Sequence, residues 1–155
     1  MSYRPTEWLA LLLGRALRLR GSDRIRGLVL IAPAVDMTDL MLRKMTKAQR
    51  RQLDKLGFAE ELSDYSTEPY RITRTLIADG EAHRLFGRVI ETGCPVAILQ
   101  GSKDREVPKE HVMKLVEHII ADPVTLTLVP DGDHRLSRPQ DLGLLERTIE
   151  LMIAE

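Results

Sequence analysis

The stretch Gln100–Pro108 constrains the fold of this chain most strongly. A short apolar run, Val96–Leu99, leads into a glycine turn that presents Asp104, and a proline then opens a helix. In α/β folds, a strand that ends in such a loop places functional groups at the carboxyl edge of a sheet. A second loop, Gly132–His134, follows a later apolar run and presents an imidazole. The chain is therefore predicted to carry an acid and a histidine at one edge of a sheet.

Three apolar runs predict three strands, at residues 28–32, 96–99 and 124–129. The first two are continuous, which is typical of parallel strands covered on both faces. The third alternates apolar residues with threonine, which indicates a strand with one wetter face at a sheet edge. Helical segments separate the strands, so the order predicts an α/β fold with three parallel strands and right-handed crossovers.

Two helices are predicted from apolar spacing after the second and third strands. The first shows an i, i+3, i+4, i+7, i+8 pattern at Val112, Leu115, Val116, Ile119 and Ile120. The second begins at Pro139, with Asp141 in its first turn. Its inner stripe is predicted to be Leu142, Leu145, Ile149, Met152 and Ile153. A further helix is expected over residues 7–19, apolar nearly all round and therefore buried.

Residues 36–93 differ in character and are predicted to form a helical insertion, so that residues 1–155 make one domain. Helices are expected over residues 47–56 and from Ile72 to Gly80. Four apolar residues of the insertion either line an acyl pocket or fill a core: Met37, Met41, Met45 and Phe58. Six basic residues either steer anionic substrates or form a solvated helix face: Arg43, Lys44, Lys47, Arg50, Arg51 and Lys55.

The charge balance excludes a global field for nucleic acid or a membrane surface, because Lys plus Arg equals Asp plus Glu at 23 each. The longest apolar run, residues 8–13, is far shorter than the roughly 20 residues that a membrane span needs. Residues 1–35 hold six arginines against Glu7 and Asp23, which fits either a mitochondrial presequence or the cationic end of a core helix. A single cysteine, Cys94, fits a reducing compartment, so a cytoplasmic location is expected.

Asp104 and His134 are the candidate catalytic residues. The acid can hold the histidine in one tautomer and stabilise its imidazolium, while the histidine serves as general base. The alternatives are a solvated turn aspartate and an ordinary loop histidine. Their joint placement, with one helix and one strand between them, favours the catalytic interpretation. His111 and His118 are seven residues apart without an acidic or cysteine cluster, so neither a metal nor a cofactor is expected.

The motif Gly101–Pro108 followed by Gly132–His134 resembles the acid and histidine motifs of the α/β-hydrolase superfamily. Within it, the chain is similar to the acyl-protein thioesterase and acyl-glucuronide esterase branch and to bacterial α/β hydrolases. Residues 8–13, residues 29–34 and the long final helix also fit this branch. The resemblance implies a partial hydrolase fold holding the sixth, seventh and eighth strands and a cap. It also implies an ester or thioester hydrolase acting on a small-molecule or acylated substrate.

The nucleophile of that family is missing. An elbow, Gly-x-Ser-x-Gly-Gly, leads straight into a tryptophan in the family, but here Arg4 stands in the register of the serine before Trp8. Ser102 is predicted to be a turn residue, and Cys94 starts a strand at the opposite edge. No complete triad can be written from this sequence. The expectation is the carboxyl-terminal portion of a serine hydrolase, from a truncated gene product or a mis-assigned start, inactive as an isolated chain.

Two other hypotheses remain open. The chain is either a non-catalytic α/β module that binds or dimerises through the exposed strand 28–32, or a partner to a second chain that supplies the first strands and the serine. An unpaired apolar strand edge favours association in either case.

Overall fold

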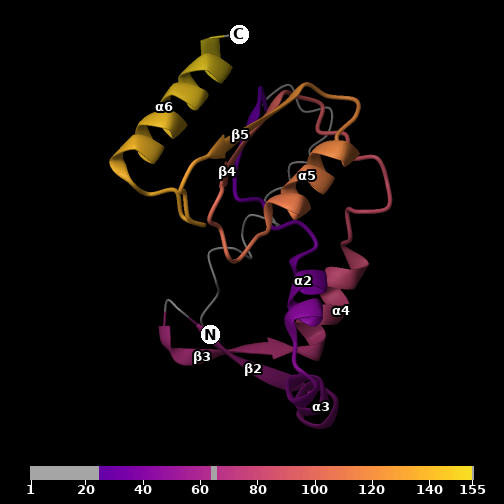
Figure 1. Ribbon diagram of the computed structural model, residues 1–155. Coiled ribbons are helices and arrows are strands. Elements are labelled where there is room, and N and C mark those ends of the chain that lie inside the picture. The colour runs from indigo at the N-terminus through magenta and orange to yellow at the C-terminus, as the bar shows by residue number, and fades with distance from the viewer. Residues whose placement is uncertain (1–24, 64–65, 155) are drawn as a thin grey trace. The chain divides into compact units, whose positions relative to one another are not determined.

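The computed structural model describes residues 25–63 and 66–154 of the chain (Figure 1). These residues form two compact units. One unit contains residues 25–35 and 85–154, and the other contains residues 36–84. The helix predicted over residues 7–19 lies outside the described residues. None of the helices in the described part of the chain is long and apolar enough to cross a membrane.

The first unit is built on a parallel sheet with the strand order β1-β4-β5. Its strands are β1 (Leu28–Ile31), β4 (Val96–Gly101) and β5 (Val124–Val129). The three predicted parallel strands are therefore confirmed. Among the described residues β5 pairs with β4 alone, as expected of a strand at a sheet edge. β1 ends before Ala32, whose left-handed backbone with φ 44° leaves the extended ladder. β4 runs two residues beyond the prediction, because Gln100 and Gly101 pair with Leu128 and Val129.

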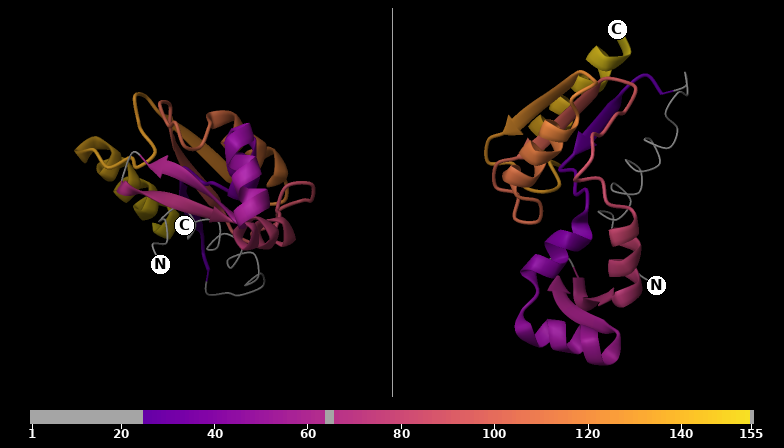
Figure 2. Two further views of the ribbon diagram at one scale, coloured as in Figure 1. Left: turned by 90° about the horizontal axis from the view of Figure 1, so that it is seen from below. Right: turned by 90° about the vertical axis from the view of Figure 1, so that its right-hand side faces the viewer.

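Two helices lie on opposite faces of this sheet, α5 (Lys109–His118) and α6 (Pro139–Ala154) (Figures 1 and 2). The central strand β4 is buried along its whole length. Because side chains alternate along a strand, Ile98 and Leu99 face opposite sides. Leu99 belongs to a cluster that includes Val129, Leu136, Leu144 and Leu145. The face of Leu99 is thus the face of α6, and Ile98 points to the side of α5.

The predicted apolar stripes of these helices are buried only in part. On α5, Val112 and Leu115 are fully buried, but Ile120 lies beyond the helix and is 70% exposed. On α6, Leu145 packs against the core, whereas three stripe residues are exposed, namely Leu142, Ile149 and Ile153. The start of α6 at Pro139 with Asp141 in the first turn is confirmed. The described residues therefore bury only part of the apolar surface of α6.

The unit of residues 36–84 contains three helices and a β-hairpin. Its elements are α2 (Met37–Lys44), α3 (Lys47–Leu56), β2 (Phe58–Ser63), β3 (Ser66–Thr73) and α4 (Arg74–Ala82). The helix predicted over residues 47–56 is confirmed as α3. The expected helical insertion also contains a hairpin that was not predicted, since β2 pairs antiparallel with β3. Ile72 lies in β3, and the following helix begins only at Arg74. Gly57, with φ 81°, ends α3 and turns the chain into the hairpin.

A small core holds this unit together. It is formed by Met45, Leu53, Ala59 and Ile72, with Met41, Leu42, Leu76 and Ile77 packed against it. Of the four candidate pocket residues, Met41 and Met45 therefore fill a core, and the ring of Phe58 lies under the Arg71 guanidinium. The six basic residues of α2 and α3 named above are exposed, as expected of a solvated helix face.

The first turn of α3 allows a test of this unit. Thr46 and Gln49 form a reciprocal capping box, with Gln49 N–H donating to Thr46 Oγ1 at 3.2 Å and Thr46 N–H donating to Gln49 Oε1 at 2.9 Å. We expect Thr46→Ala to lower the free energy of unfolding by about 1 kcal/mol, because it leaves an amide unsatisfied. Thr46→Ser, which keeps the hydroxyl, should cost much less. Urea denaturation followed by circular dichroism measures both, and equal losses would contradict the capping role.

Candidate active site

The loops that follow β4 and β5 are joined by backbone contacts. Ser102 N–H donates to Val129 O at 3.0 Å, and Lys103 N–H donates to Gly132 O at 2.9 Å. Ser102 Oγ accepts from Asp131 N–H at 2.9 Å. Ser102 is therefore a residue that joins the two loops, as the turn interpretation predicted. These contacts hold the loop of residues 102–108, called the acid loop here, against the loop of residues 130–138, called the histidine loop.

Gly101 permits this close approach. A Cβ atom at this position would lie 2.4 Å from the carbonyl oxygens of both Gly132 and Asp133. These are backbone atoms of the neighbouring loop, so they cannot move aside as a flexible side chain does. The two loops therefore lie too close together for any side chain at position 101, and this requirement for glycine is independent of its preference for turns.

The conformation of the histidine loop is set by Asp133. Its Oδ1 accepts hydrogen bonds from the backbone N–H groups of Arg135, at 3.1 Å, and Leu136, at 3.0 Å. Leu136 adopts φ 45° and is buried beside Leu99. His134 thus lies between an aspartate-capped turn and a side chain anchored in the core.

Arg138 fastens the other end of this loop to α6. Its Nε donates to Asp141 Oδ2 at 2.7 Å and its Nη2 to Asp141 Oδ1 at 2.8 Å. Its Nη1 also donates to Asp131 O at 3.1 Å. The hydrogen bond with Arg138 lowers the pKa of the Asp141 carboxyl from its ordinary value. One guanidinium therefore links the start of the histidine loop to the first turn of the helix.

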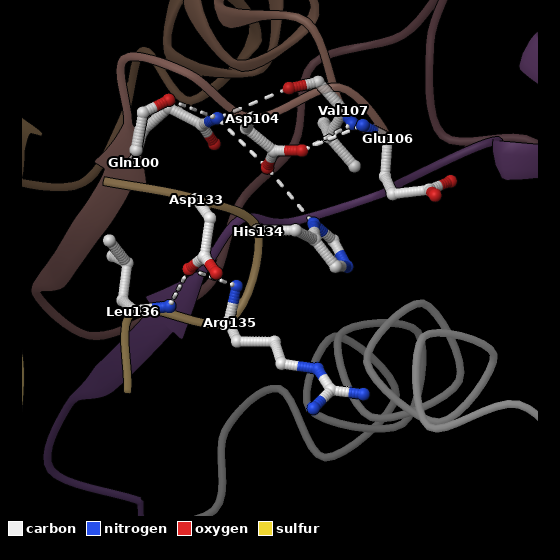
Figure 3. A network of polar contacts seen from close by, with 9 residues as sticks. Gln100, Asp104, Glu106, Val107, Asp133, His134, Arg135 and Leu136 are labelled. Carbon is white, nitrogen blue, oxygen red and sulfur yellow. Dashed lines mark hydrogen bonds and ion pairs between the residues drawn. The ribbon is translucent and has the colours of Figure 1, made fainter. Parts of the chain in front are cut away.

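The Asp104 carboxylate accepts four hydrogen bonds (Figure 3). Oδ1 accepts from the backbone N–H groups of Glu106, at 2.8 Å, and Val107, at 3.0 Å. Oδ2 accepts from Gln100 Nε2 at 3.1 Å and is 2.9 Å from His134 Nδ1. Its side chain is 1% exposed. An ionised carboxylate is an acceptor only, so this set of donors suits the charged form.

The two candidate catalytic residues are in direct contact. Because Asp104 offers only acceptors, His134 Nδ1 carries the proton and donates it to Oδ2. In a neutral ring this leaves Nε2 as the basic nitrogen. The His134 side chain is 11% exposed, against 1% for Asp104. The acid is therefore covered while the histidine keeps some access to solvent.

The environment of Asp104 favours its charged form. Burial alone raises the pKa of this carboxyl, because a carboxylate loses hydration there. The hydrogen bond and charge of His134 act the other way, together with the backbone N–H groups of Val107 and Glu106. Their sum outweighs burial and lowers the pKa of Asp104 from its ordinary value. Asp104 is thus ionised at neutral pH.

The other residues that the sequence suggested as a nucleophile or as metal ligands are not part of this site. Cys94 is buried, and burial raises the pKa of its thiol, which disfavours the nucleophilic thiolate. His111 and His118 both pack against the ring of Phe86, at 5.1 Å between ring centroids. In the described ranges, no three His, Cys, Asp or Glu residues converge as a metal site does. The register that Arg4 occupies in the sequence lies outside the described residues.

Three residues of the site were not singled out from the sequence: Gln100, Asp133 and Arg138. Asp133 directly precedes the histidine. Aspartate is favoured in turns because its carboxylate accepts hydrogen bonds from backbone N–H groups a few residues later, so this position carried a signal. Gln100 directly follows an apolar run, and only its burial in the structure shows that it needs hydrogen-bond partners. Nothing in the sequence signals the reach of Arg138 back to Asp131.

The charge of Asp104 makes the stability of the site depend on pH. We expect Asp104→Asn to lower the free energy of unfolding at neutral pH by about 1–3 kcal/mol. The folded-state pKa lies below the unfolded value of about 3.9, so the carboxylate contributes stability above that pH and loses it as the pH falls through the folded pKa. The deficit of the variant should therefore shrink in acid.

Urea denaturation at neutral pH and near pH 3 measures this difference. Asp54→Asn, at an exposed aspartate of α3, is the control and should change the free energy little at either pH. A deficit of Asp104→Asn that persists unchanged into acid would contradict the charged hydrogen bond.

Similar proteins were found by sequence, although no protein-family model matches the chain. The palmitoyl-protein thioesterase ABHD10, mitochondrial, of Bos taurus is 30% identical over 132 residues. This match covers 84% of the chain and 43% of the bovine protein. The mouse protein of the same name is also 30% identical over 132 residues, which cover 44% of its length. The chain therefore spans less than half the length of these relatives.

Solved structures with the same fold agree with these matches. A putative hydrolase from Agrobacterium vitis superposes with a TM-score of 0.84 at 50% identity, covering 94% of this chain and 57% of that one. Mouse ABHD10 superposes with a TM-score of 0.81 at 28% identity, covering 94% and 58%. Est1E from Butyrivibrio proteoclasticus shares the fold, with a TM-score of 0.65 at 18% identity.

The resemblance stated from the acid and histidine motifs is confirmed by these relatives, and so is the partial hydrolase fold with three parallel strands. The sheet order, the two loops at its edge and the relatives lead to one conclusion. The chain belongs to the α/β-hydrolase superfamily.

Proposed function

We propose that this chain supplies the acid and the base of a Ser-His-Asp acyl hydrolase, with Asp104 as the acid and His134 as the base. The observation that carries the proposal is the 2.9 Å contact between His134 Nδ1 and the buried Asp104 carboxylate. A hydrolytic triad requires such a pair, on loops that follow neighbouring strands in this superfamily.

The roles follow from the two ring nitrogens. Nε2 of His134 takes the proton of a serine hydroxyl as that oxygen attacks the acyl carbon, and the ring becomes an imidazolium. Asp104 stays ionised and stabilises this charge through Nδ1–H. As the bond to the leaving group breaks, Nε2 returns the proton to that group, and the acyl chain stays on the serine. Water, activated by the same nitrogen, then attacks this acyl-serine and releases the carboxylic acid and the free serine.

The attacking serine is the part that the 155 residues do not provide. A nucleophile elbow needs small residues around the serine so that the turn tightens, and Arg4 occupies its register before Trp8. Ser102 is engaged between the two loops. We therefore infer that the nucleophile belongs to a segment outside these residues, and that the 155-residue chain alone turns over acyl substrates very slowly.

The substrate class is inferred from the relatives. The mammalian proteins that match the chain are named palmitoyl-protein thioesterases, so a long-chain acyl thioester is the proposed substrate. Acyl transfer by a triad needs neither a metal nor a cofactor.

A second candidate function follows from the sheet order. In the described residues β1 pairs only with β4, and Leu28, Val29 and Ile31 remain partly exposed. An unpaired strand edge can pair with a second copy of the chain and extend the sheet. A tight dimer in sedimentation at several concentrations, with no acyl hydrolase activity in any context, favours this module. A monomer contradicts it.

A serine-directed fluorophosphonate probe tests the missing nucleophile. We expect the 155-residue chain to remain unlabelled under conditions that label the Agrobacterium vitis hydrolase. Labelling of the isolated chain would show that one of its own residues attacks, and the inference of a missing serine would then be wrong.

A chimera tests the roles of the acid and the base. We expect residues 25–155, grafted in place of the matching part of the Agrobacterium vitis hydrolase, to cleave an acyl thioester. In this chimera, His134→Ala should lower kcat by about 10⁶-fold, because the base is lost, and Asp104→Asn by about 10⁴-fold, because the tautomer is lost. Thiol release from a palmitoyl thioester measures kcat.

His83→Ala is the control for this experiment, since His83 lies on the surface of the other unit, and it should leave kcat unchanged. An active chimera that tolerates both His134→Ala and Asp104→Asn would contradict the proposed roles.

A further inference from the structure

Gln100 occupies an unusual position for a polar side chain. It is the fifth residue of β4, and it is 0% exposed. Because side chains alternate along a strand, it points to the same face as Val96 and Ile98, both of which are buried apolar residues. Its amide therefore lies in the interior of the sheet, at the point where the acid loop leaves it.

The amide nitrogen of Gln100 contacts three oxygen atoms (Figure 3). Nε2 lies 3.1 Å from each of Gly101 O, Val107 O and Asp104 Oδ2. None of these three atoms can donate a hydrogen bond, so the nitrogen and not the oxygen of the amide must face them. The two N–H bonds of the amide are thus shared among three acceptors, namely the carbonyls of Gly101 and Val107 and the Asp104 carboxylate.

The oxygen of the same amide has no partner. Gln100 Oε1 is buried and has no hydrogen-bond partner among the described residues. A buried acceptor without a donor destabilises a fold, and an apolar side chain of the same shape avoids that loss. The position therefore makes use of the two donors of the amide alone.

The oxygen that Gln100 contacts is the one that His134 also contacts. Asp104 Oδ2 receives both Gln100 Nε2 and His134 Nδ1, whereas Oδ1 is held by two backbone N–H groups. Rotation of the carboxylate about its side-chain bonds is thus opposed at both oxygens. Among the residues that the structure describes, Gln100 alone contacts Oδ2 on the side opposite the imidazole (Figure 3).

We propose that Gln100 is a positioning residue that holds Asp104 Oδ2 toward His134 and so fixes the Nδ1–H tautomer of the imidazole. This inference rests on the proposed function, because the tautomer matters only if Nε2 acts as a base. A residue that acts through the acid in this way does not touch the substrate.

A purely structural role is the competing explanation, since the same amide also ties Gly101 O to Val107 O. The two explanations differ in what a matched packing defect does. Val107 is 2% exposed, and its side chain carries no hydrogen-bonding atom. Val107→Ala therefore loosens the same loop while keeping the amide of Gln100, the N–H of residue 107 and its carbonyl group.

The experiment uses the 155-residue chain labelled with 15N at its histidine rings. Long-range 1H–15N correlation spectra at mildly alkaline pH report which ring nitrogen carries the proton. In the unmodified chain we expect His134 as the Nδ1–H tautomer. Gln100→Met, which removes the donors and also the unpartnered oxygen, should raise the Nε2–H population severalfold. Val107→Ala should lower the midpoint of urea unfolding and leave the tautomer unchanged.

Gln100→Glu provides a second test that survives a failure of the methionine variant to fold. A carboxyl group beside Asp104 stays protonated in acid, and its O–H can then replace the lost donor. We expect ionisation of this carboxyl as the pH rises to destabilise the variant, because the donor to Asp104 Oδ2 is then lost. The unfolding midpoint of the variant should therefore fall over that range, the more so because two like charges then meet in the interior.

The outcomes separate this inference from the proposed function. An unchanged tautomer in Gln100→Met, or an equal change in Val107→Ala, overturns the positioning role. A pH-independent unfolding midpoint in Gln100→Glu contradicts the contact with Asp104 as well. None of these readouts requires turnover, so an inactive chimera leaves the positioning role standing and contradicts only the proposed hydrolase function.

Discussion

The parallel pairing of β4 with β5 is the constraint on which the site depends. Register along this pair places Gly101 opposite Val129, so the acid loop and the histidine loop leave the sheet side by side. The absence of a side chain at Gly101 then allows the two backbones to meet. Asp104 and His134 lie 30 residues apart in the sequence and within hydrogen-bonding distance in the fold. Their contact is a consequence of strand register more than of any local motif.

A buried carboxylate is stable in this place because its hydration is replaced in full. Burying an unpaired charge is costly, and proteins avoid it by supplying donors or by neutralising the group. Asp104 receives two backbone N–H groups, one side-chain amide and one imidazole. The first three donors belong to the acid loop and the end of β4. They therefore orient the carboxylate independently of the histidine. This preorganisation is what an acid that must stabilise an imidazolium requires.

The sequence predicted the parts of the fold that follow from strong apolar patterning. The runs at residues 96–99 and 124–129 have few alternatives to strands, and a strand followed by a loop and a helix determines which edge the loops share. The hairpin of β2 and β3 was missed because its strands are rich in polar residues and show no apolar alternation. It forms because Ala59 and Ile72 reach the small core of the second unit. Gln100 was missed because its role depends on atoms of three different residues, which no spacing along the chain reveals.

Asp104 and His134 are in contact in this chain, and the proposed function depends on that pairing. The most direct test is the proton resonance of His134 Nδ1–H in the 155-residue chain at neutral pH. The account predicts a low-field signal, protected from exchange with solvent, that disappears in Asp104→Asn. A chain that is folded but gives no such signal, or one that survives Asp104→Asn, would contradict it.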